Sequence, residues 1–130
     1  MAASKTYAEQ QNIKYAQKIN ELLKIFPEFC REYFNSLEYS KQPRTRLAYA
    51  RDLKTFFEFL IAEFPQYSNY QISDFTLHDI ESVTGQDISD YLRYMKVYDK
   101  DGTTVTNDER AAKRKLCSLR RFYGYFYSYE

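Results

Sequence analysis

The segment "PRTRLAYARDLKTFFEFLIAEF", from Pro43 to Phe64, decides the fold. Its apolar side chains recur at helical spacing and fall within about 60° of Leu53 when each residue turns the chain by about 100°. The stripe consists of Tyr49, Phe56, Phe57, Leu60 and Phe64. Pro43 suits the first turn of a helix, and Pro65 prevents its continuation. The segment therefore predicts one long helix with a face in the core.

The remainder of the 130 residues also reads as helices, separated by glycine, proline and polar turns. Thr76 with Asp79 indicates a cap for a short turn, and Thr106 with Glu109 matches the T-x-x-E capping box before the last helix. Before the last helix we also expect a helix over 4–25, capped by Ser4, a short helix through 29–37 and a helix over 87–98. Residues 103–106 are expected to be briefly extended. We expect an all-α fold, a compact bundle of four to five helices forming one domain over 1–130.

The last helix, "RAAKRKLCSLRRFYGYFY" from Arg110 to Tyr127, combines basic and aromatic residues. With Leu116 as the reference, one apolar stripe lies within about 80° of it. This stripe, expected to be buried, contains Ala112, Leu119, Tyr123 and Phe126. The opposite, exposed face would carry Arg110, Arg114, Ser118 and Arg121. We further expect Leu119 to be buried with Leu53 and the two long helices to pack side by side.

Positive charge is concentrated on these two helices although the net charge is only +1. Arginines alternating with small polar residues suit contacts to phosphates and base edges of DNA. The candidate contacts are Arg44, Thr45, Arg51, Arg114, Ser118 and Arg121, with Lys54, Arg110 and Lys113 as phosphate partners at the rim. A basic helix face is often merely solvated, so the pattern by itself leaves both interpretations open.

Other site chemistries find no support in the sequence. His78 is the single histidine, and Cys30 and Cys117 stand far apart in no metal-binding spacing. A calcium loop starting at Asp99 would place Thr104 where glycine is required. We therefore expect no metal, no cofactor and no catalytic residue. The two isolated cysteines and the lack of an apolar run that could span a bilayer favour a cytoplasmic protein with no membrane partner.

Three segments resemble the core-binding domain of tyrosine recombinases, the phage integrase family. "QPRTRLAYARDLKTFFEFL" is similar to its opening helix, "FTLHDIESVTGQDISDYLRYM" to its middle section and "AAKRKLCSLRRFYGYF" to its last helix. Gln42 stands where serine is common, Lys115 where arginine is usual and Cys117 where serine is usual. The resemblance covers about residues 27–129, and residues 4–25 are the least covered part.

This resemblance implies a SAM-like, DNA-binding core-binding domain, half of a clamp around double-stranded DNA, acting in integration and recombination. It implies a bacterial or phage origin, a mobile element, and as partners the catalytic domain of the same parent chain and neighbouring recombinase protomers. The family's catalytic domain uses Arg…His-x-x-Arg groups and a tyrosine nucleophile, and His78 is followed by no such arginine. We expect the catalytic domain to be absent and the fragment to be no enzyme.

A different class of function stays open. The aromatic surplus could form a protein–protein interaction surface instead of a DNA-binding one. Its expected centre is the patch of Phe122, Tyr125, Tyr127 and Tyr129 near the C-terminus.

Overall fold

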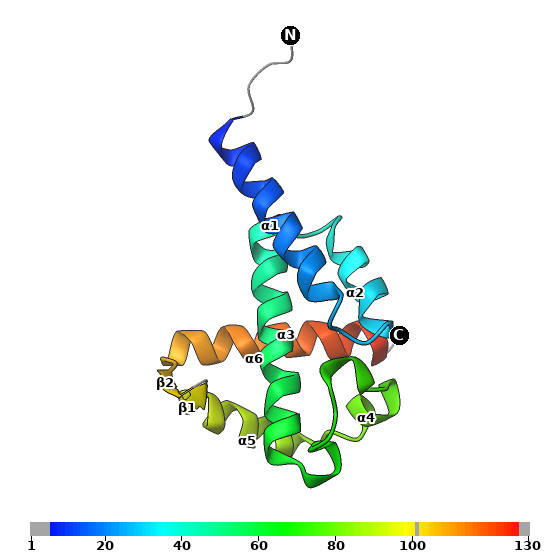
Figure 1. Cartoon of the computed structure of the whole chain (residues 1–130), viewed down its shortest axis with the longest axis vertical. Coiled ribbons are helices and arrows are strands. Elements are labelled where there is room, and N and C mark those ends of the chain that lie inside the picture. The colour runs from blue at the N-terminus through cyan, green and yellow to red at the C-terminus, as the bar shows by residue number, and fades with distance from the viewer. Residues whose placement is uncertain (1–5, 101, 128–130) are drawn as a thin grey trace.

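The computed structural model describes residues 6–100 and 102–127, and these form a helical bundle with one short hairpin (Figure 1). The described part contains six α-helices, so the expected all-α class is confirmed and the expected number of helices was too low. The helices are α1 Tyr7–Leu23, α2 Phe29–Leu37, α3 Pro43–Glu63, α4 Leu77–Glu81, α5 Gly85–Lys96 and α6 Glu109–Tyr127. Two 3-10 turns, Pro65–Tyr67 and Ile72–Asp74, connect α3 to α4.

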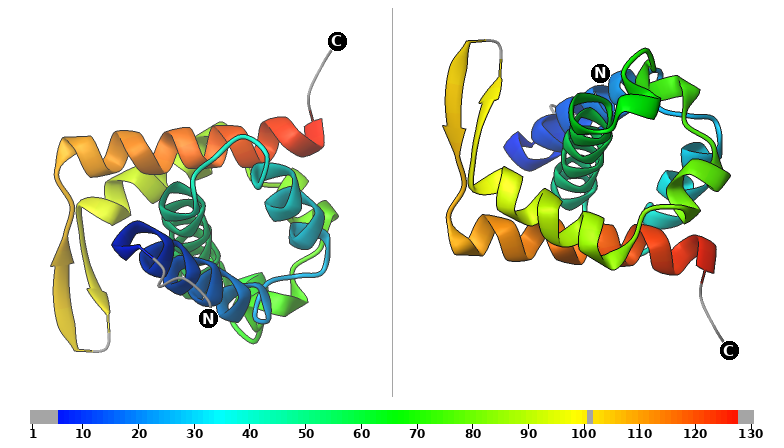
Figure 2. Two further views of the ribbon diagram at one scale, coloured as in Figure 1. Left: turned by 90° about the horizontal axis from the view of Figure 1, so that it is seen from above. Right: turned by 90° about the horizontal axis from the view of Figure 1, so that it is seen from below.

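Helix α3 is the centre of the bundle and is buried on more than the one face that its apolar stripe predicts. Its fully buried side chains point in several directions and include Leu47, Ala50, Asp52, Leu53, Phe56, Phe57, Phe59 and Leu60. α1 and α6 lie on opposite sides of α3 (Figure 2). α6 crosses α3 instead of running alongside it, which corrects the expected side-by-side packing (Figure 1). Because α6 crosses the central helix, only a short stretch of each can meet the other.

Local hydrogen bonds define where the helices begin. Thr76 and Asp79 form the predicted cap of α4, and the cap is a capping box: Asp79 N donates to Thr76 Oγ1 at 3.2 Å and Thr76 N to Asp79 Oδ2 at 3.0 Å. α1 begins after Thr6, which caps it, and Ser4 lies outside the described residues. α6 is capped by Asp108, whose Oδ1 accepts from Ala111 N at 2.9 Å. The Thr106 capping box was therefore wrong.

Thr106 is unable to cap α6 because it ends a strand and lies three residues before the helix begins at Glu109. β1, Val97–Lys100, pairs antiparallel with β2, Thr103–Thr106. The extended conformation predicted for 103–106 is thus confirmed. This segment is one of the two strands of a hairpin between α5 and α6. Gly102 adopts a φ of 78° in the turn, a conformation open to glycine at little cost. Asn107 closes the base of the hairpin, with its Nδ2 donating to Met95 O at 2.6 Å.

The core beside α3 is dominated by aromatic rings. Tyr33 of α2 packs edge-on against Phe122 of α6 at a centroid distance of 5.3 Å, and Phe57 stacks on Phe75 at 4.9 Å. Phe29 meets Phe126 edge-on at 5.6 Å, so α2 and the C-terminal half of α6 share one cluster. Within the described residues, no helix is long and apolar enough to span a bilayer.

Candidate nucleic-acid interface

The buried face of α6 differs from the one that its apolar residues predict. Leu119 is buried as expected, but Ser118 is only 4% exposed and Leu116 is half-buried. The fully buried positions of the helix are Lys115, Ser118, Leu119 and Phe122. The helix is therefore rotated from the predicted orientation, with Lys115 near the middle of its inner face. Ser118, a predicted DNA contact, points into the protein, so its assignment to the exposed strip was wrong.

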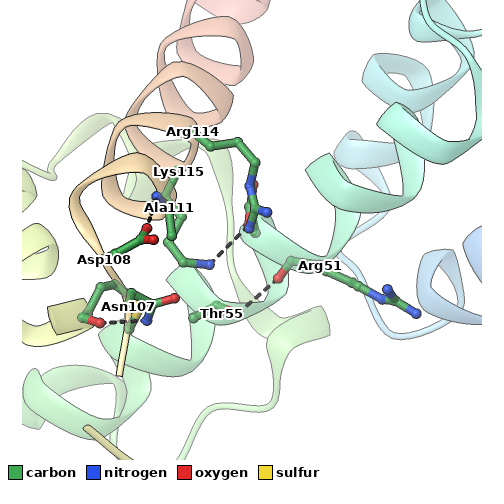
Figure 3. Close-up of polar contacts among 9 residues, drawn as sticks. Arg51, Thr55, Asn107, Asp108, Ala111, Arg114 and Lys115 are labelled. Atoms are coloured by element: carbon green, nitrogen blue, oxygen red, sulfur yellow. Dashed lines mark hydrogen bonds and ion pairs between the residues drawn. The ribbon is translucent and has the colours of Figure 1, made fainter. Parts of the chain in front are cut away.

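A buried carboxylate explains this rotation. Asp52 of α3 has a side chain only 3% exposed, and it accepts hydrogen bonds from two consecutive residues of α6, Arg114 and Lys115. Figure 3 shows both of these side chains extending from α6 toward α3. Lys115 Nζ donates to Asp52 Oδ1 at 3.0 Å. Arg114 donates twice, from Nη2 to Oδ1 at 2.8 Å and from Nε to Oδ2 at 3.2 Å. We call Asp52, Arg114 and Lys115 the Asp52 triad.

The triad satisfies the physical requirement that a buried charge be paired and hydrogen-bonded. Lys115 is nearly as enclosed as the acid, with a side chain 8% exposed, whereas the side chain of Arg114 is 51% exposed. Two cations and one anion leave the triad with a net charge of one positive unit. Arg114 is therefore an ion-paired residue at the edge of the protein, instead of the free surface arginine that the sequence predicts.

Four cations lie on the outer side of α6 and form what we call the α6 basic strip. They are Arg110, Lys113, Arg120 and Arg121, and all four residues are exposed. Lys113 Nζ lies 4.0 Å from Glu109 Oε1, a distant pair between two highly exposed side chains. Arg121 Nη2 donates to Ser40 Oγ at 3.1 Å. Arg110 and Arg120 form no ion pair with any described residue, so both are available to an anionic partner.

Arg120 was missed by the sequence-based list because the helix had been oriented on Leu116. The signal that could have corrected the orientation is Asp52, an acid beside the core residue Leu53 on the neighbouring helix. A buried acid requires a cation opposite it, so an inward Asp52 favours an inward cation on α6.

The candidate contacts on α3 are divided between exposed and half-buried positions. Arg44 and Arg51 are exposed as predicted, whereas Thr45 and Lys54 are half-buried. Thr55, also half-buried, donates from Oγ1 to Arg51 O at 3.0 Å, so its hydroxyl is occupied within the helix. Figure 3 shows the Arg51 side chain pointing away from Arg114. The structure therefore unites α3 and α6 through Asp52 and not through the two predicted arginine faces.

Arg51 and Lys54 face α1 instead. Together with Lys18 and Glu21 they line a hollow of about 340 Å³ between α1 and α3. Its floor is apolar and includes Leu47. Three cations against one acid give this hollow a positive character, which adds a second basic area to the molecule.

The aromatic interaction patch is not supported at its centre. Phe122 is only 1% exposed and belongs to the core. Tyr125 and Tyr127 are half-buried, and the Tyr127 hydroxyl donates to Leu77 O at 3.2 Å. Tyr129 lies outside the described residues. In the part of the chain that the structure describes, no group of three or more His, Cys, Asp or Glu residues is arranged to hold a metal ion.

Comparison with known proteins finds a similarity between this helical chain and a recombinase. It is 34% identical over 109 residues to the tyrosine recombinase XerC of Caldanaerobacter subterraneus subsp. tengcongensis. Over these residues the chain is similar to a tyrosine recombinase. The match covers 79% of the chain and only 29% of the length of that recombinase. No family model matches the chain, and no solved structure matches it.

Proposed function

We propose that this chain is the core-binding domain of a tyrosine recombinase and that it binds double-stranded DNA. The observation that carries the proposal is the α6 basic strip, where Arg110 and Arg120 are exposed without an ion pair to any described residue. The sequence relationship to a tyrosine recombinase supports the choice of DNA as the anionic partner. Arg44 and Arg51 supply further exposed cations on α3.

The proposed contacts are mainly to phosphates. Arg110, Lys113, Arg120 and Arg121 lie along about three turns of one helix, which suits a row of phosphate oxygens more than a single base pair. Such contacts hold a protein on the duplex without reading its sequence. We propose accordingly that the domain contributes affinity and orientation, as one half of a clamp whose other half is the catalytic domain of a parent recombinase.

The proposal also assigns no catalytic role to the residues of this chain. Cleavage of DNA by a tyrosine nucleophile requires clustered cations around the scissile phosphate, and His78 is an exposed residue on the short helix α4. We expect no covalent adduct when the chain is incubated with a nicked suicide duplex. A covalent protein–DNA band on a denaturing gel would contradict this assignment.

A salt titration with duplex DNA tests the proposed binding. Each phosphate contact should contribute about −0.9 to the slope of log affinity against log salt, so four contacts give about −4. Charge reversal of Arg110 and Arg120 to Glu should weaken binding by tenfold or more and reduce the slope by about two.

Arg93 offers a matched control for the charge reversals. It is exposed on α5, and its only ion pair to a described residue is a distant one with Asp90 at 3.8 Å. Arg93→Glu changes the net charge as much as either single reversal on α6. It should alter affinity far less than Arg120→Glu does. Equal losses from the two variants would show that overall charge, and not the α6 basic strip, governs binding.

A further inference from the structure

The Asp52 triad has a geometry that goes beyond joining two helices. We propose that Asp52 is a positioning residue for DNA binding: it holds the Arg114 guanidinium in advance, so that its free edge is ready to receive a DNA phosphate. This inference rests on the proposed function and adds to it a specific acidic residue buried behind the binding surface. It predicts that the negatively charged Asp52 strengthens binding to DNA, although the Coulomb repulsion between Asp52 and the phosphates alone would weaken it.

The two hydrogen bonds to Asp52 use only one edge of the guanidinium. Nε and Nη2 donate to the two carboxylate oxygens of Asp52, at 3.2 and 2.8 Å. Nη1 donates to no described residue, and half of the Arg114 side chain is exposed. A planar guanidinium fixed along one edge presents its remaining N–H groups in a defined direction. The same side chain can thus be bound to the protein and still receive a phosphate.

Lys115 prevents Asp52 from cancelling the charge of Arg114. Its amine lies 3.0 Å from Asp52 Oδ1 and is nearly as buried as the carboxylate. One buried cation therefore neutralises the buried anion, and the triad retains one positive charge on its half-exposed member. A simple Asp–Arg pair would offer a phosphate no net attraction, whereas this arrangement offers both attraction and order.

Order matters because an arginine loses side-chain freedom when it binds. Arg110 and Arg120 have no ion pair to a described residue and must be immobilised by the DNA itself. The Arg114 side chain has already lost this freedom in the folded protein, because Asp52 holds it. Fixing one flexible side chain in advance is expected to improve affinity by about two- to tenfold.

Two variants separate positioning from charge. Lys115→Met retains Asp52 and its double hydrogen bond to Arg114. Asp52→Asn combined with Lys115→Met has one negative charge fewer than Lys115→Met, but it weakens the hold on Arg114. Coulomb attraction alone predicts that the double variant binds duplex DNA more tightly. The positioning role predicts that it binds about two- to tenfold more weakly. Tighter or equal binding by the folded double variant overturns the proposal.

Arg114→Gln, introduced into both backgrounds, shows whether the effect passes through Arg114. With Arg114 removed, Asp52→Asn should no longer weaken binding, and its remaining effect should be the slight gain expected from lost negative charge. A persistent loss without Arg114 contradicts a positioning role. If the wild-type chain fails to bind duplex DNA at low salt, the proposed function itself is overturned, and the two failures are thereby distinguished.

A measurement on the wild-type protein gives a test that needs no variant to fold. The Arg114 Nε–H group should give a sharp, slowly exchanging NMR signal in the absence of DNA, because it donates to a buried carboxylate. The Arg110 and Arg120 groups should exchange rapidly with water. An Arg114 signal as mobile as that of Arg120 would show that Asp52 does not hold it, and the proposal would fail.

Discussion

The two halves of α6 pack against the rest of the bundle through different kinds of interaction. The N-terminal half meets α3 through the charges of the Asp52 triad. The C-terminal half meets α2 through rings, with Phe122 and Phe126 packed against Tyr33 and Phe29. Charges with fixed hydrogen bonds specify one rotation of the helix, whereas apolar contact mainly supplies stability. The comparison separates what orients α6 from what stabilises it.

The largest expected effect is on the aromatic half. Phe122→Ala should lower the free energy of unfolding by about 4 kcal/mol, because the ring is 1% exposed and touches Tyr33 and Phe126. Denaturant unfolding followed by circular dichroism measures the loss. Gly124→Ala is the control on the same turn, since an added Cβ meets no atom within 4 Å. It should stabilise the helix by up to about 1 kcal/mol. A loss below about 1 kcal/mol for Phe122→Ala would contradict the assigned core position.

Truncation in the polar half should lower the free energy of unfolding somewhat less, and a second substitution should restore most of the loss. Asp52→Ala leaves Lys115 buried without its carboxylate, which should cost about 3 kcal/mol. Adding Lys115→Met removes the unpaired cation and should recover most of that loss, because a buried ion pair is often replaceable by apolar side chains. Urea midpoints of the two variants measure the difference. A double variant no more stable than Asp52→Ala would show that Lys115 does not depend on Asp52.

The sequence predicted α3 well and the orientation of α6 poorly, for a physical reason. α3 is central, so its long apolar stripe and its flanking prolines determine it locally. On α6 the apolar residues extend round much of the helix, and the deciding interaction is between Asp52 and Lys115, 63 positions apart. A pattern within one helix contains no information about such a partner. The same limitation misplaced Ser118 and left out Arg120.

Alkaline pH should destabilise the fold through two groups on α2, the helix that packs against the aromatic half. Burial raises the pKa of the Cys30 thiol and of the Tyr33 hydroxyl, although Arg121 partly opposes the effect on Tyr33. Below the pKa of an unfolded thiol, about 8.5, both states are neutral and stability is complete. Above it the unfolded state loses its proton first, so stability falls by about 1.4 kcal/mol per pH unit.

Between pH 8 and pH 10 the loss attributable to Cys30 should thus be about 2 kcal/mol. Urea unfolding across this range measures it. Cys30→Ala should lower stability at neutral pH but flatten the slope below pH 10, where Tyr33 does not yet contribute. An unchanged slope in Cys30→Ala would show that another group titrates.

The smallest expected effect compares two tyrosine hydroxyls at the aromatic end. Tyr123 donates to Ile80 O at 2.8 Å, and that carbonyl also accepts a longer bond from Val83 N at 3.3 Å. Tyr123→Phe should therefore cost about 1 kcal/mol. The buried Tyr33 hydroxyl has no hydrogen-bond partner in the described part of the chain, so Tyr33→Phe should leave stability unchanged or raise it by up to about 1 kcal/mol. Thermal unfolding at pH 7 distinguishes the two, and a larger loss for Tyr33→Phe than for Tyr123→Phe would mean that the Tyr33 hydroxyl has a partner in solution.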